Sequence, residues 1–328
     1  MMSRFLCVFV LFLGTIVSAN SQQIKTAIIL PDNYHQLGES VKSGAKQALS
    51  SHNIDADVSS YYYSDLDQTS YQELSQFQLI FIDIVNPAKV EKVLPLLNQL
   101  AASQAKVFAV GSEEAAELGT YTNIQWDTRS IAFYEQSGRD NLVAMVLDQG
   151  RRSLGLEIPP QSPILIPDFA LCNIQNKEIS TDFASYRESY EAYMEGNPWI
   201  AINLWRSDFL SEQLLHFKEY VRQFEDNGFN VLCYYGFPTQ EDVEPLFYDE
   251  AGRLIPEVIL AQSAWLGANP IENRRTFEKL GIPVINMIQV SQSAEEWMEN
   301  EKGIKVYRRG IGNESSSSGR VDHGSNNF

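Results

Sequence analysis

The stretch Trp199–Leu210, WIAINLWRSDFL, begins the part of the chain that decides the fold. An apolar run ends at Leu204, a polar turn follows, and an amphipathic segment continues over 211–224. The pattern recurs in three further runs: FNVLCYYGFP (229–238), PEVILAQSAWLG (256–267) and IPVINMIQVSQS (282–293). Strands that alternate with helices predict a parallel sheet covered on both faces. Because ligands bind at the carboxyl ends of such strands, a site is expected in the loops after Leu204, Tyr235, Ala261 and Met287.

The amino-terminal half shows the same alternation of apolar runs and helical segments. Its expected strands are KTAIIL (25–30), ADVSSYYY (56–63), FQLIFIDIV (77–85), KVFAVG (106–111) and TNIQW (122–126). The order predicts a flavodoxin-like α/β domain over residues 20–128, with right-handed crossovers. Pro95 lies within an expected helix at 87–102 and predicts a kink or an early end of that helix. The first strand-to-helix turn, LPDNYHQLGES (30–40), contains neither G-x-G-x-x-G nor a Walker A motif, so a bound dinucleotide is not expected.

Residues 129–195 read as a helical, proline-rich connector. The segment SGRDNLVAMVL (137–147) predicts a helix, and prolines at 159, 160, 163 and 167 then interrupt regular structure. Another helix is expected in DFASYRESYEAYMEG (182–196), where three tyrosines share a face that we interpret as packing. A second α/β domain follows over 196–304. The predicted fold is therefore two Rossmann- or flavodoxin-like parallel-sheet domains joined by this connector.

The first 19 residues have the pattern of a secretory signal. Arg4 supplies a positive start, 5–17 are apolar, and Val17-Ser18-Ala19 offers a small-residue cleavage site. An uncleaved anchor is the alternative, but the run is shorter than the ~20 residues that span a bilayer. The pattern predicts an exported protein, periplasmic or secreted, with no transmembrane segment after cleavage.

Charge and cysteine content exclude several classes of partner and site. A formal net charge of −17 argues against nucleic acid, whose binding depends on Lys and Arg. Cys172 and Cys233 remain after signal removal and form no CxxC motif. They could pair in an exported protein, but Cys233 within FNVLCYY favours a buried small apolar residue.

The second half resembles the amino-terminal part of the cobaltochelatase large subunit (CobN) and magnesium chelatase large subunit family. The resemblance rests on the SGRDNLVAMVL helix, on Pro167-Asp168, and on a strand that ends in NLWR (203–206). It rests further on YYGFP (234–238), PEVILAQSAWLG, and LGIPVINMIQVSQSAEEWMENEKGI (280–304). It covers most of residues 130–304.

The resemblance implies a protein that handles a tetrapyrrole and its central metal. The expected signal suits a secreted haem-uptake branch better than the cytoplasmic, ATP-dependent enzymes. A tetrapyrrole is then the expected ligand or substrate, with no resident cofactor or metal identified. Arg206 is a candidate partner for a propionate, while Trp205, Tyr235 and Phe237 are candidates to cover the flat ring.

The family runs on beyond Gly303, whereas this sequence continues into a Ser-, Gly- and Asn-rich segment, 305–328, that predicts a disordered tail. We therefore expect a truncated product without the catalytic body, whose partners would be that body or other subunits. No catalytic residue is assigned: adjacent Glu295 and Glu296 point to different sides of a helix. Independent catalysis is left open. The alternatives are a periplasmic solute-binding protein and a non-catalytic interaction module.

Overall fold

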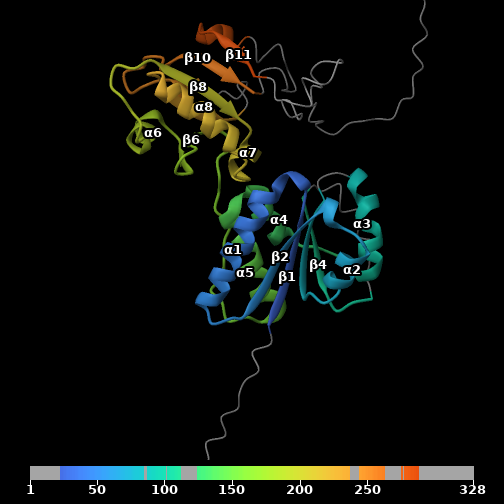
Figure 1. The fold of residues 1–328 in the computed structure, drawn as a ribbon. Helices are drawn as coiled ribbons and strands as arrows, with labels where there is room; N and C mark the ends of the chain where they lie inside the picture. The colour runs from blue at the N-terminus through green and yellow to red at the C-terminus, as the bar shows by residue number, and fades with distance from the viewer. Residues whose placement is uncertain are drawn as a thin grey trace, which may run out of the picture.

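The computed structural model describes residues 23–84, 87–100, 102–111, 124–236, 244–262, 275 and 277–287. They form two α/β units, each built on its own sheet, here called sheet A and sheet B (Figure 1). The expected signal segment, the tail and Glu295–Glu296 lie outside the described residues, so the predictions made for them stay predictions.

Sheet A is a parallel sheet with the strand order β2-β1-β3-β4-β5. Its strands are β1 (Ile24–Leu30), β2 (Ala56–Tyr62), β3 (Leu79–Ile84), β4 (Lys106–Gly111) and β5 (Ile124–Trp126). The α/β fold expected from the alternating runs is confirmed. The strand order reverses between β1 and β3, and ligands of open α/β sheets bind at the carboxyl ends of the strands at such a point.

Helices cover both faces of sheet A (Figure 1). One face packs against α1 (His35–Ser51), α4 (Thr128–Gln136) and α5 (Gly138–Leu154), and the other against α2 (Gln68–Leu74) and α3 (Pro87–Leu100). Short 3-10 turns follow two strands, η1 (Asp32–Tyr34) and η2 (Tyr63–Asp65). Helix α1 lies so close to α5 that a Cβ on Gly44 would stand 2.9 Å from Val143. Helix α3 continues through Pro95 to Leu100.

Sheet B has the order β11-β10-β8-β9-β6-β7 and is mixed. Its strands are β6 (Ala170–Asn173), β7 (Glu178–Ser180), β8 (Trp199–Leu204), β9 (Asn230–Tyr235), β10 (Pro256–Ala261) and β11 (Val284–Asn286). The four expected strands, β8 to β11, are parallel, whereas β6 and β7 form an antiparallel hairpin beside β9. The four predicted strands are confirmed as parallel, and the hairpin, which was not predicted, makes the sheet mixed. The sequence pattern did not predict the hairpin, because its strands are only four and three residues long.

The stretch expected to be a connector divides between the two sheets. Helices α4 and α5 pack on sheet A, whereas β6, β7 and α6 (Phe183–Ser189) belong with sheet B. Helices α7 (Arg206–Leu210) and α8 (Leu215–Asp226) cover one face of sheet B, and α6 with η4 (Glu244–Phe247) covers the other.

Two tyrosines complete the hydrogen bonding of β9 where β6 diverges from it. The Tyr186 hydroxyl donates to the Val231 carbonyl at 2.9 Å and accepts from the Cys233 N–H at 3.3 Å. The Tyr190 hydroxyl accepts from the Val231 N–H at 3.1 Å. Cys172 and Cys233 are both buried and free, and burial raises the pKa of each thiol.

Candidate functional site

A pocket lies at the carboxyl-end edge of sheet A, where elements of both units meet. Its volume is about 300 Å³. Loops and helices of the first unit and helix α7 of the second supply its walls: Tyr34, Leu37, Gly111, Tyr134, Glu135, Ser137, Leu142, Arg206, Ser207 and Leu210. Apolar walls with a few polar groups are typical of small-molecule sites. The pocket therefore lies where the strand order of sheet A indicates a ligand.

A buried carboxylate is joined to this pocket through a tyrosine. Asp83, at the end of β3, is 1% exposed and accepts a hydrogen bond from the Tyr134 hydroxyl. Its main-chain carbonyl accepts from the Tyr63 hydroxyl. Burial, and then the charge of Asp83, raises the pKa of Tyr134 and of Tyr63 well above the usual range. Both phenols are therefore protonated donors at neutral pH.

Gly111, at the end of β4, makes room for this cluster. Its φ of +112° is in a region that side chains rarely adopt. A Cβ there would lie 3.0 Å from the Ile84 carbonyl oxygen and 3.2 Å from Asp83 Oδ1. Only glycine lets β4 end beside the carboxylate.

Arg206 lines the pocket from α7 and is held by main-chain carbonyls. Its Nε donates to Pro167 O at 3.1 Å, and its Nη2 donates to Gln136 O at 3.3 Å and Ile166 O at 3.2 Å. Nη1 makes no hydrogen bond with the part of the chain that the structure describes. The guanidinium is thus fixed in direction and keeps one nitrogen for an acceptor in a ligand.

The other residues chosen from the sequence lie in different surroundings. Trp205 caps α7, is half-buried, and is not among the residues that line the pocket. Tyr235 is fully buried and stacks on Phe209 with ring centroids 5.7 Å apart. Phe237 lies outside the described residues. The structure thus places Arg206 in the pocket and encloses Tyr235, and their roles with a tetrapyrrole stay predictions.

Tyr34, Tyr134, Ser137 and Ser207 line the pocket but were not singled out from the sequence as ligand contacts. Tyr34 stands in the turn after the first expected strand, where the sequence shows no phosphate-binding loop. Its place at a strand's carboxyl end was the signal available. Ser207 follows Leu204 and had the same signal, whereas Ser137 had none, because helix packing brings it to the pocket.

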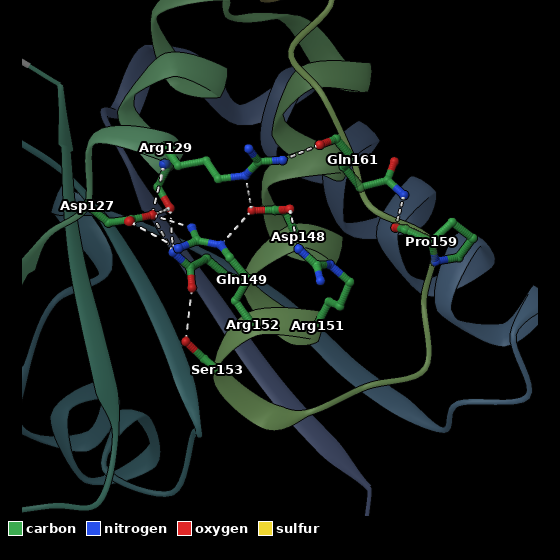
Figure 2. Close-up of polar contacts among 10 residues, drawn as sticks. Asp127, Arg129, Asp148, Gln149, Arg151, Arg152, Ser153, Pro159 and Gln161 are labelled. Atoms are coloured by element: carbon green, nitrogen blue, oxygen red, sulfur yellow. Dashed lines mark hydrogen bonds and ion pairs between the residues drawn. The ribbon is translucent and has the colours of Figure 1, made fainter.

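A second polar cluster joins α4 and α5 (Figure 2). Asp148 is 1% exposed and receives Arg129 Nε at 2.8 Å and Arg152 Nε at 2.7 Å. Arg152 also bonds Asp127. Burial acts to raise the pKa of Asp127, but hydrogen bonds from Arg152 and Ser130 outweigh burial, so the pKa is lowered. Arg129 reaches the Gln161 carbonyl in the proline-rich segment. Because the charges satisfy one another, we interpret the cluster as structural.

A larger hollow of about 620 Å³ runs along α8. It is shallow, and five of its six lining residues belong to one helix: Gln175, Leu215, His216, Lys218, Glu219 and Arg222. Arg222 and Glu219 pair with each other there at 2.6 Å. The pocket beside Arg206 is the better site because it joins both units at the carboxyl-end edge.

A metal-binding cluster and a membrane-spanning helix are both absent from the described ranges. They contain no group of three or more His, Cys, Asp or Glu side chains arranged to hold a metal ion. None of the helices among them has the length and apolar character that a membrane crossing requires.

Comparison with known proteins gives one family match. The family model described as CobN/Magnesium Chelatase matches residues 131–309, and no curated protein matches the chain. Among solved structures, the catalytic subunit of cobaltochelatase from Mycobacterium tuberculosis is similar with a TM-score of 0.54 at 15% identity. The match covers 85% of this chain and 22% of that one, so this chain spans about a fifth of that subunit's length.

Two other solved structures are less similar. The lactose-specific IIB component domain from Streptococcus pneumoniae has a TM-score of 0.21 at 10% identity, covering 30% of this chain and 86% of its own. The NAD+-bound 3-phosphoglycerate dehydrogenase of Entamoeba histolytica has a TM-score of 0.24 at 11% identity, with 73% and 62% covered. Neither similarity is high enough to bear on fold or function.

Proposed function

Because this chain belongs to the CobN/magnesium chelatase family, we propose that it holds a tetrapyrrole for a reaction in which the central metal enters or leaves the ring. One observation carries the proposal. The polar wall of the pocket, formed by Tyr134, Glu135, Ser137, Arg206 and Ser207, falls within the residues that match the family.

In this proposal the pocket takes an acidic edge of the ring. Arg206 Nη1 meets a propionate carboxylate, because guanidinium and carboxylate form strong charge-assisted hydrogen bonds. The aromatic side chains of Tyr34 and Tyr134 offer apolar contact beside it. Trp205 lies next to Arg206 in the chain and covers the ring outside the pocket. Tyr235, enclosed within sheet B, supports this wall without touching the ligand.

We further propose that the ligand is haem or a related metalloporphyrin, and that the chain acts with a catalytic region or other chelatase subunits. This part of the proposal rests on the family, whose model matches residues 131–309. Export to the periplasm or the medium is part of the proposal and rests on the signal-like first 19 residues. Amino-terminal sequencing of the mature protein tests it, and an intact Met1 on the cellular protein would contradict it.

The experiment for the main proposal is a titration of the purified protein with haem and with metal-free protoporphyrin. Binding should shift the Soret absorbance and raise the melting temperature, because a ligand that binds the folded state stabilises it. If both stay unchanged, the proposal is wrong. Closure around sugars or amino acids instead would support a solute-binding protein, an alternative that the family match does not favour.

Arg206→Lys provides the matched variant for the titration. Lysine keeps the positive charge but loses the planar fork, so porphyrin affinity should fall by about tenfold. Arg253→Lys is the control, since the Arg253 side chain is 81% exposed and pairs only locally with Asp249. Equal losses in the two variants would mean that Arg206 does not meet the ligand.

A further inference from the structure

Ser137 has a backbone conformation that is almost restricted to glycine. It joins α4 to α5 with φ 60° and ψ −170°. Non-glycine residues in this region are strained, and such strain persists only where the surroundings hold it. Here Arg206 Nη2 bonds the carbonyl of the preceding Gln136, and Asn141 Nδ2 bonds the Ser137 carbonyl at 3.1 Å. Asn141 is itself anchored by the Ile164 N–H at 2.8 Å.

The strained conformation brings the helix no capping bond. Ser137 stands at the N-cap of the 17-residue helix α5, where a serine hydroxyl usually accepts from the first turn. It makes no such bond. Among the described residues the hydroxyl has no hydrogen-bond partner at all, and Ser137 instead lines the pocket. A strained residue whose polar atom is unused and borders a cavity is typical of a ligand contact.

A second serine borders the same pocket. Ser207, on α7, also makes no side-chain hydrogen bond within the described ranges. Arg206 belongs to the same pocket lining and keeps Nη1 for a ligand. The acidic member of the lining, Glu135, is exposed, so solvent screens its charge.

We infer that Ser137 and Ser207 donate, together with Arg206 Nη1, to one carboxylate of the bound ligand. The subsite deepens the proposed function, on which it rests for the identity of the ligand as a tetrapyrrole. Its chemistry can be tested separately, because a free carboxylate of the right size carries the recognised group without the ring.

The test uses two variants of the full chain. Ser137→Gly removes the hydroxyl and relieves the strained backbone, so its melting temperature should rise. Ser207→Ala removes the other hydroxyl within a helix that tolerates alanine. The control is Asn53→Gly, which relaxes another residue of positive φ, 58°, in the turn after α1.

Sodium propionate and uncharged propionamide serve as fragment probes, and protoporphyrin IX and its dimethyl ester serve as complete ligands. Propionate should raise the melting temperature of wild type and the control more than propionamide does, and the serine variants should lose this difference. Protoporphyrin should bind Ser137→Gly about tenfold more weakly than wild type, as expected for a lost hydrogen bond to a charged group. The ester should bind both proteins equally.

The outcomes separate the subsite from the proposed function. If Ser137→Gly responds to propionate and protoporphyrin as wild type does, the subsite is wrong and the function stands. A second outcome is that propionate stabilises wild type but neither serine variant, while protoporphyrin does not bind wild type at all. In that case the subsite stands and the tetrapyrrole function is wrong. A Ser137→Gly melting temperature no higher than wild type would overturn the strain argument and the inference with it.

Discussion

Tyr234 and Tyr235 are neighbours on β9 and point into opposite faces of sheet B. Both hydroxyls are buried and find no hydrogen-bond partner in the described structure. Burying an unsatisfied polar group costs free energy, so Tyr235→Phe should keep or raise the free energy of unfolding, by up to about 1 kcal/mol. Porphyrin affinity should not change, because the Tyr235 side chain is enclosed and does not reach the ligand. Urea denaturation and the porphyrin titration measure the two effects.

Tyr186→Phe is the matched comparison for that prediction. It removes a hydroxyl that bonds Val231 O and the Cys233 N–H, so stability should fall by about 1–3 kcal/mol. Equal effects of the two substitutions would mean that hydrogen bonding does not distinguish these tyrosines.

His216 predicts a pH dependence at the scale of one side chain. Burial lowers its pKa from the usual 6.5, while the charge of Asp208 acts in the opposite direction. The folded state therefore favours the neutral ring. Above the unfolded pKa of about 6.5 neither state is protonated, and as pH falls below it the unfolded state takes up the proton first. Stability is lost in that range.

The measurement is the melting temperature of wild type and His216→Gln between about pH 7.5 and 5.5. The variant should lose less stability on acidification than wild type. If the melting temperatures of the two proteins fall in parallel with pH, His216 is not the group that causes the loss of stability.

At the scale of elements, the Asp148 cluster joins α4, α5 and the proline-rich segment (Figure 2). Asp148→Ala leaves Arg129 and Arg152 without their buried partner. Removing one member of a buried charge network is strongly destabilising, so the free energy of unfolding should fall by about 3 kcal/mol. Chemical denaturation measures it. Glu219→Ala, which breaks an exposed pair on α8, is the control and should change stability little.

At the scale of the whole molecule, Arg206 ties the second unit to the first. Its bonds to Gln136, Ile166 and Pro167 connect α7 with α4 and the connecting segment. Ser40 on α1 adds a bond to Glu212, which also pairs with Lys177. These hydrogen bonds join the two units within the described ranges, so each is expected to help fix the relative position of the units.

Arg206→Ala should therefore loosen the connecting segment. Chymotrypsin cleavage near Leu165, whose side chain is 82% exposed, should accelerate by about five- to tenfold, the effect of roughly 1 kcal/mol in local opening. Arg253→Ala is the control. Cleavage at the wild-type rate would show that Arg206 does not hold the segment.

Much of the fold could be predicted because strands such as β3 and β9 are continuous apolar runs between polar loops. The short β6–β7 hairpin could not, since its place in the sheet depends on β9, whose paired residues are 63 and 65 positions further along the chain. Of the candidate site, Arg206 was found from its place after a strand. Ser137 was expected only as the start of a helix, because a sequence does not display a backbone angle.

The sequence by itself determined the α/β class, the positions of the long strands and the family, because these depend on local periodicity and on motifs carried within the chain. Only the tertiary structure decided which residues meet. It brought Tyr34, Ser137 and Arg206 from far-apart segments to one pocket and enclosed Tyr235 behind Phe209. The physical reason is that side-chain neighbours across a sheet edge are set by strand order and helix packing, which no local pattern encodes.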